Sequence, residues 1–262
     1  MGLDLSALLA DWPFEQGQIN VRLIQGDDGD PKLQLRVDLG ILQMELTGRP
    51  DGLRPQGHES LLDLYTQSLE TAPHPHDANP QDDPQTPTLS ADDCRLLREE
   101  ALQYYHRYIA LLVLGDYEGV IRDTTRNLRV MDLCKDHAEE DDDRVVLEQF
   151  RPYVIMMRTR ALASQAVSEG ETKAAMLSLD LGLELLANLF EDIGAPEQLD
   201  ESHEAALLRG MRAELMNKLP ASQTSELRER LKSAIAAENY ELAAILRDEL
   251  KMMRDDTPPT RA

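Results

Sequence analysis

Hydrophobic and polar residues alternate through much of the first fifty positions of the chain. An apolar cluster at Leu3, Leu5, Leu8 and Leu9 precedes this region and predicts a short helix, which ends before Trp12-Pro13 because the residue preceding a proline is disfavoured in helices. The segments 19–23 and 33–39 place an apolar residue at every second position, and the turn-forming residues 26–31 separate them. A third alternating stretch runs from Leu42 to Leu46. The pattern predicts a three-stranded antiparallel meander.

One face of this meander is apolar and needs a cover. The helical stripe of Leu61, Leu62, Tyr65 and Leu69 could provide it. Arg22, Gln34, Arg36 and Asp38 occupy the other face, which we expect to be solvated rather than to form a binding surface.

Residues 71–92 lack periodic apolar positions. They are rich in Pro, Asp, Gln, Thr and His. Such a composition is typical of a flexible linker, because it offers little apolar surface to bury.

Beyond Asp93 the apolar positions recur at helical spacing. Gly115 interrupts the pattern, and Asp116 is placed to cap the helix that follows. Pro152 is expected to kink the next helix or to start its main part, and Gly170 marks a second break. Residues 93–219 therefore predict two successive helical hairpins followed by one more helix. Together with Asp116-Tyr117-Glu118, this pattern resembles a divergent pair of tetratricopeptide-type hairpins.

Two short amphipathic helices are predicted near the C-terminus. Their apolar positions are Leu227, Leu231, Ala234 and Ile235 in the first, and Tyr240, Ala243, Ala244, Leu246 and Leu250 in the second. Asn239 suits the N-cap of the second helix.

The whole pattern predicts a mainly α protein with a small N-terminal β-meander, a helical-hairpin body and a C-terminal helical hairpin. The expected divisions are an α+β module at 1–70, the linker at 71–92, the body at 93–219, the terminal hairpin at 222–254 and a disordered tail at 255–262.

The chain is strongly acidic, with a formal net charge of −22 over 262 residues. A field of this sign repels phosphate backbones, and no concentrated basic patch offsets it, so direct nucleic-acid binding is not expected. No segment is long and apolar enough to cross a bilayer, and the N-terminus lacks the pattern of a signal peptide. These features predict a cytoplasmic protein without membrane contact.

Few residues suggest metal or catalytic chemistry. Cys94 and Cys134 are the only cysteines, too few for a four-thiolate metal site, and are expected to be semi-buried helix thiols. The pair His74 and His76 has no nearby Cys or third His. No glycine-rich phosphate loop, nucleophile elbow, HExxH or CxxC is present. We therefore predict no enzyme activity, cofactor or metal site. A concave peptide groove in the body is a further hypothesis, lined by Arg95, Arg98, Arg107, Arg122 and Arg126.

The pattern Tyr240-Glu-x-Ala-Ala-x-x-Arg-Asp-x-Leu250 resembles the UVR motif, a helical hairpin found in the UvrB and UvrC excision-repair proteins and in Clp-type unfoldase subunits. Together with the meander, it makes the chain similar to bacterial UVR-motif proteins to which no activity is attached. The resemblance implies a protein-docking element. The implied docking residues are Leu227, Leu231, Ala234, Ile235, Tyr240, Ala243, Ala244, Leu246, Arg247, Asp248 and Leu250.

These observations favour a non-enzymatic adaptor. Its hairpin would dock on a UVR-like or other helical hairpin, in a partner protein or in a second copy of the chain. Two alternatives remain open: an accessory factor of nucleotide excision repair acting in a DNA-bound complex, and a regulator of Clp proteolysis. The UVR-motif proteins known as activators in that system also carry paired zinc-binding cysteine motifs. This chain lacks such motifs, which weakens the second alternative.

Overall fold

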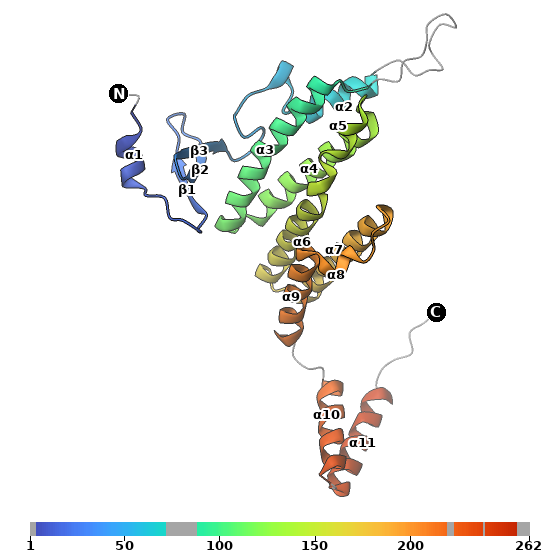
Figure 1. Cartoon of the computed structure of the whole chain (residues 1–262). Helices are drawn as coiled ribbons and strands as arrows, with labels where there is room; N and C mark the ends of the chain where they lie inside the picture. The colour runs from blue at the N-terminus through green and yellow to red at the C-terminus, as the bar shows by residue number, and fades with distance from the viewer. Residues whose placement is uncertain (1–3, 72–87, 219–222, 238, 256–262) are drawn as a thin grey trace, which may run out of the picture. The chain divides into compact units, whose positions relative to one another are not determined.

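The computed structural model describes residues 4–71, 88–218, 223–237 and 239–255 (Figure 1). The predicted fold class is confirmed: the chain is mainly α, with a small three-stranded antiparallel sheet at the N-terminus and helices toward the C-terminus. The chain divides into two units, Met1–Arg212 and Ala213–Ala262. The predicted linker at 71–92 and the predicted tail at 255–262 lie largely outside the described residues.

The sheet follows the predicted meander closely. Strands β1 (Asn20–Gln25), β2 (Pro31–Val37) and β3 (Gly40–Glu45) pair in the order β1-β2-β3, with both pairings antiparallel. A short helix, α1 (Ser6–Asp11), precedes the sheet. Leu33, Leu35 and Met44 form the buried apolar face of the sheet, and helix α3 packs against β1 and β2.

The polar face of the central strand is also buried, so the expectation of a solvated face is wrong for β2. Arg36 donates from Nε to the carbonyl oxygen of Trp12 at 2.8 Å, and the guanidinium of Arg22 stacks on the Trp12 ring at 4.1 Å. Gln34 accepts a hydrogen bond from Arg22 Nε at 2.8 Å. The segment that follows α1 thus covers polar side chains whose hydrogen bonds are satisfied internally, as burial requires.

The helices of the first unit follow the sheet. Their bounds are α2 (Leu61–Thr71), α3 (Ala91–Leu114), α4 (Tyr117–His137), α5 (Asp141–Val145), α6 (Arg151–Ser168), α7 (Thr172–Asp192) and α8 (Gln198–Glu201), and α9 (His203–Lys218) crosses the boundary between the two units. Single 3₁₀ turns occur at Pro55–Gly57 and Glu148–Phe150. The long helices pack in succession, α3 on α4, α4 on α6 and α6 on α7 (Figure 1).

Local signals set most of these helix ends. Gly115 ends α3 with a φ of 76°, a left-handed conformation that glycine adopts without a Cβ penalty. Asp116 then accepts a hydrogen bond from the Gly119 amide at 2.9 Å, which confirms the predicted cap of α4. At its N-terminus, α3 begins within the predicted linker, because Ser90 and Asp93 form a reciprocal capping box.

The main apolar core joins α2, α3, α4 and the start of α6. Its members include Leu62, Leu97, Val130 and Val154. Cys94 and Cys134 also lie in this core as free thiols on helices, and both are fully buried rather than semi-buried as predicted. Burial raises the pKa of Cys134 to about 12, which keeps its thiol protonated at neutral pH.

The second unit contains the C-terminal hairpin of α10 (Gln223–Ala236) and α11 (Tyr240–Asp255), which pack on each other. Asn239 accepts a hydrogen bond from the Leu242 amide at 3.2 Å through its side-chain oxygen. The predicted N-cap of α11 is therefore confirmed.

Candidate functional site

A buried ion pair connects the helical body to the sheet. Arg107 of α3 and Asp123 of α4 are both fully buried, and two charge-assisted hydrogen bonds of 2.7 and 2.8 Å join them. The remaining terminal nitrogen of Arg107 donates to the carbonyl oxygens of Glu45 and Gly48 at the end of β3. A guanidinium suits this position because its planar fork can bind a carboxylate and still donate elsewhere.

A second buried carboxylate, Glu100 of α3, lies in the same region. It accepts the Leu61 amide at the start of α2 and a hydrogen bond from Arg126 of α4. Arg49, in the segment after β3, is a further ion-pair partner at 3.3 Å. Together these contacts fix the N-terminal module and α2 on the pair α3 and α4.

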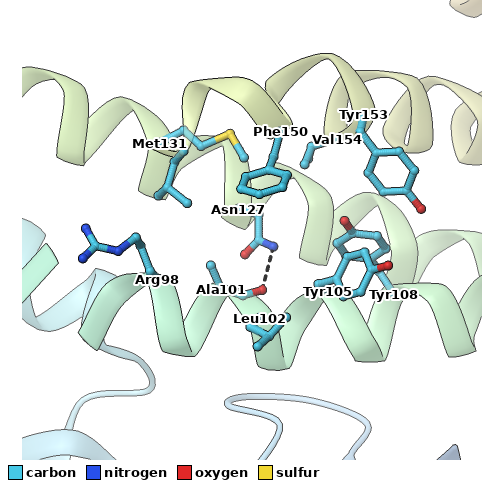
Figure 2. A pocket seen from close by; sticks show the side chains of 11 residues that line it. Arg98, Ala101, Leu102, Tyr105, Tyr108, Asn127, Met131, Phe150, Tyr153 and Val154 are labelled. Atoms are coloured by element: carbon cyan, nitrogen blue, oxygen red, sulfur yellow. Dashed lines mark hydrogen bonds between the residues drawn. The ribbon is translucent and has the colours of Figure 1, made fainter. Parts of the chain in front are cut away.

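An apolar slot of about 430 Å³ opens on the body between α3, α4 and the start of α6. Figure 2 shows Ala101, Leu102 and Tyr105 on the α3 side, with Phe150, Tyr153 and Val154 opposite them and Asn127 and Met131 of α4 behind. Leu102 and Phe150 are exposed. A slot of this size and lining has room for a bulky aliphatic or aromatic group.

The polar groups of this slot are already engaged or neutral. Asn127 donates to the Ala101 carbonyl oxygen at 3.0 Å (Figure 2), and Arg98 forms an ion pair with Asp143. Burial raises the pKa of Tyr108 and of Tyr153, so both hydroxyls stay protonated. The slot therefore presents an uncharged surface apart from one paired arginine.

The five arginines proposed to line one peptide groove lie in three places. Arg95 is on the surface and pairs with Asp92 and Glu99. Arg98 borders the apolar slot, whereas Arg107, Arg122 and Arg126 line a separate polar cavity. A single groove with all five arginines is not present, because their positions on α3 and α4 face different neighbours.

The C-terminal hairpin divides its predicted docking residues into two groups. Ala234, Ala243 and Leu246 are buried where α10 meets α11, and Leu231 packs partly buried against them. These four residues hold the two helices together. Ile235 and Tyr240 instead face solvent, with 54% and 69% of their surface exposed.

The remaining predicted docking residues are charged, are half-buried, or have side chains outside the described residues. Arg247 and Asp248 are exposed and pair with each other at 3.2 Å, and Ala244 is half-buried. The side chains of Leu227 and Leu250 lie outside the described residues. The docking role itself stays a prediction for all of these positions.

The sequence reading missed two exposed apolar residues of the hairpin. Ile245 is 63% exposed, and Leu242 is partly exposed beside a shallow concavity that Ala234 and Ala237 also line. Both residues occupy variable positions of the quoted motif pattern. Their spacing of three residues on α11 is the signal that could have placed them together.

The structure thus contains a helical body and a C-terminal two-helix hairpin. Residues 221–256 match the family described as "UvrB/uvrC motif". The C-terminal hairpin therefore carries a UVR motif, as the sequence pattern predicted, and this motif occurs in protein- and DNA-interaction contexts such as UvrB and UvrC. No curated protein and no solved structure matches the chain.

No helix in the described part of the chain is long and apolar enough to cross a membrane. Nor do three or more His, Cys, Asp or Glu side chains gather in an arrangement that could hold a metal ion within that part.

Proposed function

We propose that the chain is a non-enzymatic, cytoplasmic adaptor that docks a partner protein through the outer surface of its UVR hairpin. The observation that carries this proposal is the division of apolar residues in the hairpin. Ala234, Ala243 and Leu246 pack between α10 and α11, so the hairpin itself already buries them and they cannot contact a partner. Ile235, Tyr240 and Ile245 are left exposed although they are large and apolar.

A second helical hairpin is the occupant that fits this surface. Two helices bury only one side of each other, whereas four helices enclose a common core. The occupant we propose belongs to a different protein and not to a second copy, because two chains of net charge −22 repel each other. A UVR-like hairpin in a protein of lower net negative charge would meet less of this repulsion.

The test replaces one exposed apolar residue by a charge. Ile245→Asp is expected to weaken partner binding at least tenfold, since burial of an isoleucine side chain contributes about 1.5–3 kcal/mol. Leu39→Asp is the matched control: Leu39 is also exposed and apolar but lies in the turn between β2 and β3. Proteins co-purifying from the native cell would be quantified by mass spectrometry for the wild-type chain and both variants.

Two outcomes would contradict the proposal. One is an Ile245→Asp chain that keeps its full set of partners while its helical circular dichroism is unchanged. The other is a wild-type chain that forms a homodimer through the hairpin by analytical ultracentrifugation, which would refute the choice of a different protein as the occupant.

A role in a DNA-bound repair complex is the second candidate, and the UvrB/uvrC motif is the observation that favours it. Filter binding at low salt distinguishes this hypothesis from the adaptor proposal. Affinity for a DNA duplex that falls steeply with salt would favour direct contact with DNA. The adaptor proposal instead expects no retention of DNA by the isolated chain. Recovery of a Clp unfoldase subunit with the wild-type chain would favour the regulator of Clp proteolysis.

A further inference from the structure

A polar cavity of about 360 Å³ lies between α2, α3 and α4 and shares no lining residue with the apolar slot. Four arginines line it: Arg107 of α3, and Arg122, Arg126 and Arg129 of α4. The three arginines of α4 are spaced by four and three residues, which places them along one face of the helix. Such a row of guanidinium groups is unexpected in a chain with a net charge of −22.

Two of these arginines have a structural explanation. Arg107 is neutralised by Asp123, and Arg122 donates to Asp123 at 2.9 Å and to the Leu46 carbonyl oxygen. Both arginines therefore fix the end of β3 to the body. Arg126 also has a buried partner in Glu100, whereas Arg129 has none in the described part of the chain.

Arg126 is buried without a full set of partners. Only 10% of its side chain is exposed, and its guanidinium stacks on the Tyr104 ring at 4.1 Å. Its two terminal nitrogens donate to Glu100 and to Asn127, but its Nε has no hydrogen-bond partner. Burial lowers the pKa of Arg126 to about 9, opposed by the charge of Asp63 and assisted by those of Arg49 and Arg129. Arg126 therefore pairs with Glu100 and still has one buried donor, its Nε, without an acceptor.

Arg129 has no partner in the described part of the chain. It is exposed, and none of the described residues forms an ion pair or hydrogen bond with it. Thr125 lines the same cavity, and its hydroxyl accepts from Arg158 at 2.9 Å, which leaves the hydroxyl proton for an acceptor. Guanidinium groups and hydroxyls are the donors that proteins use for oxyanions.

Glu59 and Asp63 form the acidic side of the cavity, at the start of α2. The Asp63 carboxylate accepts a hydrogen bond from the Ser60 hydroxyl at 2.7 Å. These two carboxylates would repel a second anionic group. They therefore favour a ligand with a single oxyanion group on the α4 side over a polyanion such as a nucleic acid.

We propose that this cavity binds a small ligand through a single oxyanion group, a carboxylate or a phosphate, held by Arg129 and Arg126 of α4. The stacking of Arg126 on Tyr104 holds its guanidinium in place before the ligand arrives. The site is independent of the UVR hairpin, so this inference and the proposed docking function can fail separately.

Inorganic phosphate and acetate are the probes. Each is titrated into the full chain by isothermal titration calorimetry, against sodium chloride of the same ionic strength. Arg129→Gln is expected to lower the affinity for the bound probe at least tenfold, the loss typical of a charge-assisted hydrogen bond. Arg129→Lys, which keeps the charge, is expected to retain measurable binding. Tighter binding of phosphate or of acetate identifies which oxyanion the site prefers.

Arg95→Gln is the matched control, because Arg95 is another exposed arginine, on α3, away from the cavity. It is expected to bind the probe as the wild-type chain does. The proposal is overturned if neither probe binds more tightly than chloride, or if Arg95→Gln and Arg129→Gln weaken binding equally. Equal weakening would show a response to net charge and not to a site.

Discussion

At the scale of single residues, Arg107 and Asp123 connect the sheet with the helical body. Sixteen positions separate them in the sequence, and neither belongs to a recognisable motif. Asp123 accepts hydrogen bonds from both Arg107 and Arg122, and these arginines in turn donate to the main chain at the end of β3. Desolvation of such charges is unfavourable, and only the full set of partners offsets it.

Asp123→Asn should therefore be strongly destabilising. The substitution leaves Arg107 fully buried without its counter-charge, and breaking a buried pair in this way costs about 3–5 kcal/mol. Urea denaturation measures the change in the free energy of unfolding. Asp92→Asn serves as the control, because Asp92 pairs with Arg95 at the surface with 87% of its side chain exposed, and we expect a loss below about 1 kcal/mol. Equal losses in the two variants would refute the structural role given to Asp123.

At the scale of helices, α6 and α7 approach each other closely at a glycine, which has no side chain. Gly182 of α7 lies against Thr159 of α6, and a Cβ built at Gly182 would meet the Thr159 side chain at 2.3 Å. Gly210 of α9 is also inside a helix, but a Cβ there would meet nothing within 4 Å. The two glycines therefore differ in their surroundings and not in their local structure.

This difference predicts opposite effects of the same substitution. Gly182→Ala should lower the free energy of unfolding by about 1–3 kcal/mol, as overpacking of a filled core does. Gly210→Ala should raise it by up to about 1 kcal/mol, because alanine is the better helix former. Thermal unfolding followed by circular dichroism checks both variants. Stabilisation by Gly182→Ala would show that α6 and α7 are not packed closely at this point.

At the scale of the whole molecule, the negative net charge influences which partners the chain can bind. Its 49 acidic residues face only 27 lysines and arginines, and many of these cations are used in internal ion pairs. Residues 223–255 of the hairpin carry seven Asp or Glu and six Lys or Arg, so the negative charge comes from the rest of the chain. A partner of lower negative charge is therefore favoured over a second copy of the chain.

Self-repulsion of this size should make stability depend on salt. We expect the midpoint of thermal unfolding to rise when sodium chloride is increased from about 10 to about 150 mM, since screening shortens the reach of the repulsion from about 30 to about 8 Å. The measurement is a thermal scan at pH 7 in a non-binding buffer. An unchanged or lower midpoint would mean that the favourable ion pairs lose as much by screening as the repulsion does.

The sequence by itself determined those features that depend on neighbouring residues. The alternation along residues 19–46 predicted the meander, Gly115-Asp116 predicted the turn from α3 to α4, and Asn239 predicted the cap of α11. Each of these rests on local backbone preference or on the period of the apolar residues. The UVR motif was recognised for the same reason, because its residues lie within one continuous stretch of two helices.

Only the tertiary structure decided which surfaces are free. It buried the polar face of β2 under the segment after α1, and it separated Ala234 and Leu246, which hold the hairpin together, from Ile235, which faces solvent. It also brought Arg126 and Arg129 to one cavity with Ser60 of a distant segment. A helical period shows that residues share a face, but whether a neighbour covers that face depends on contacts between segments far apart in the chain.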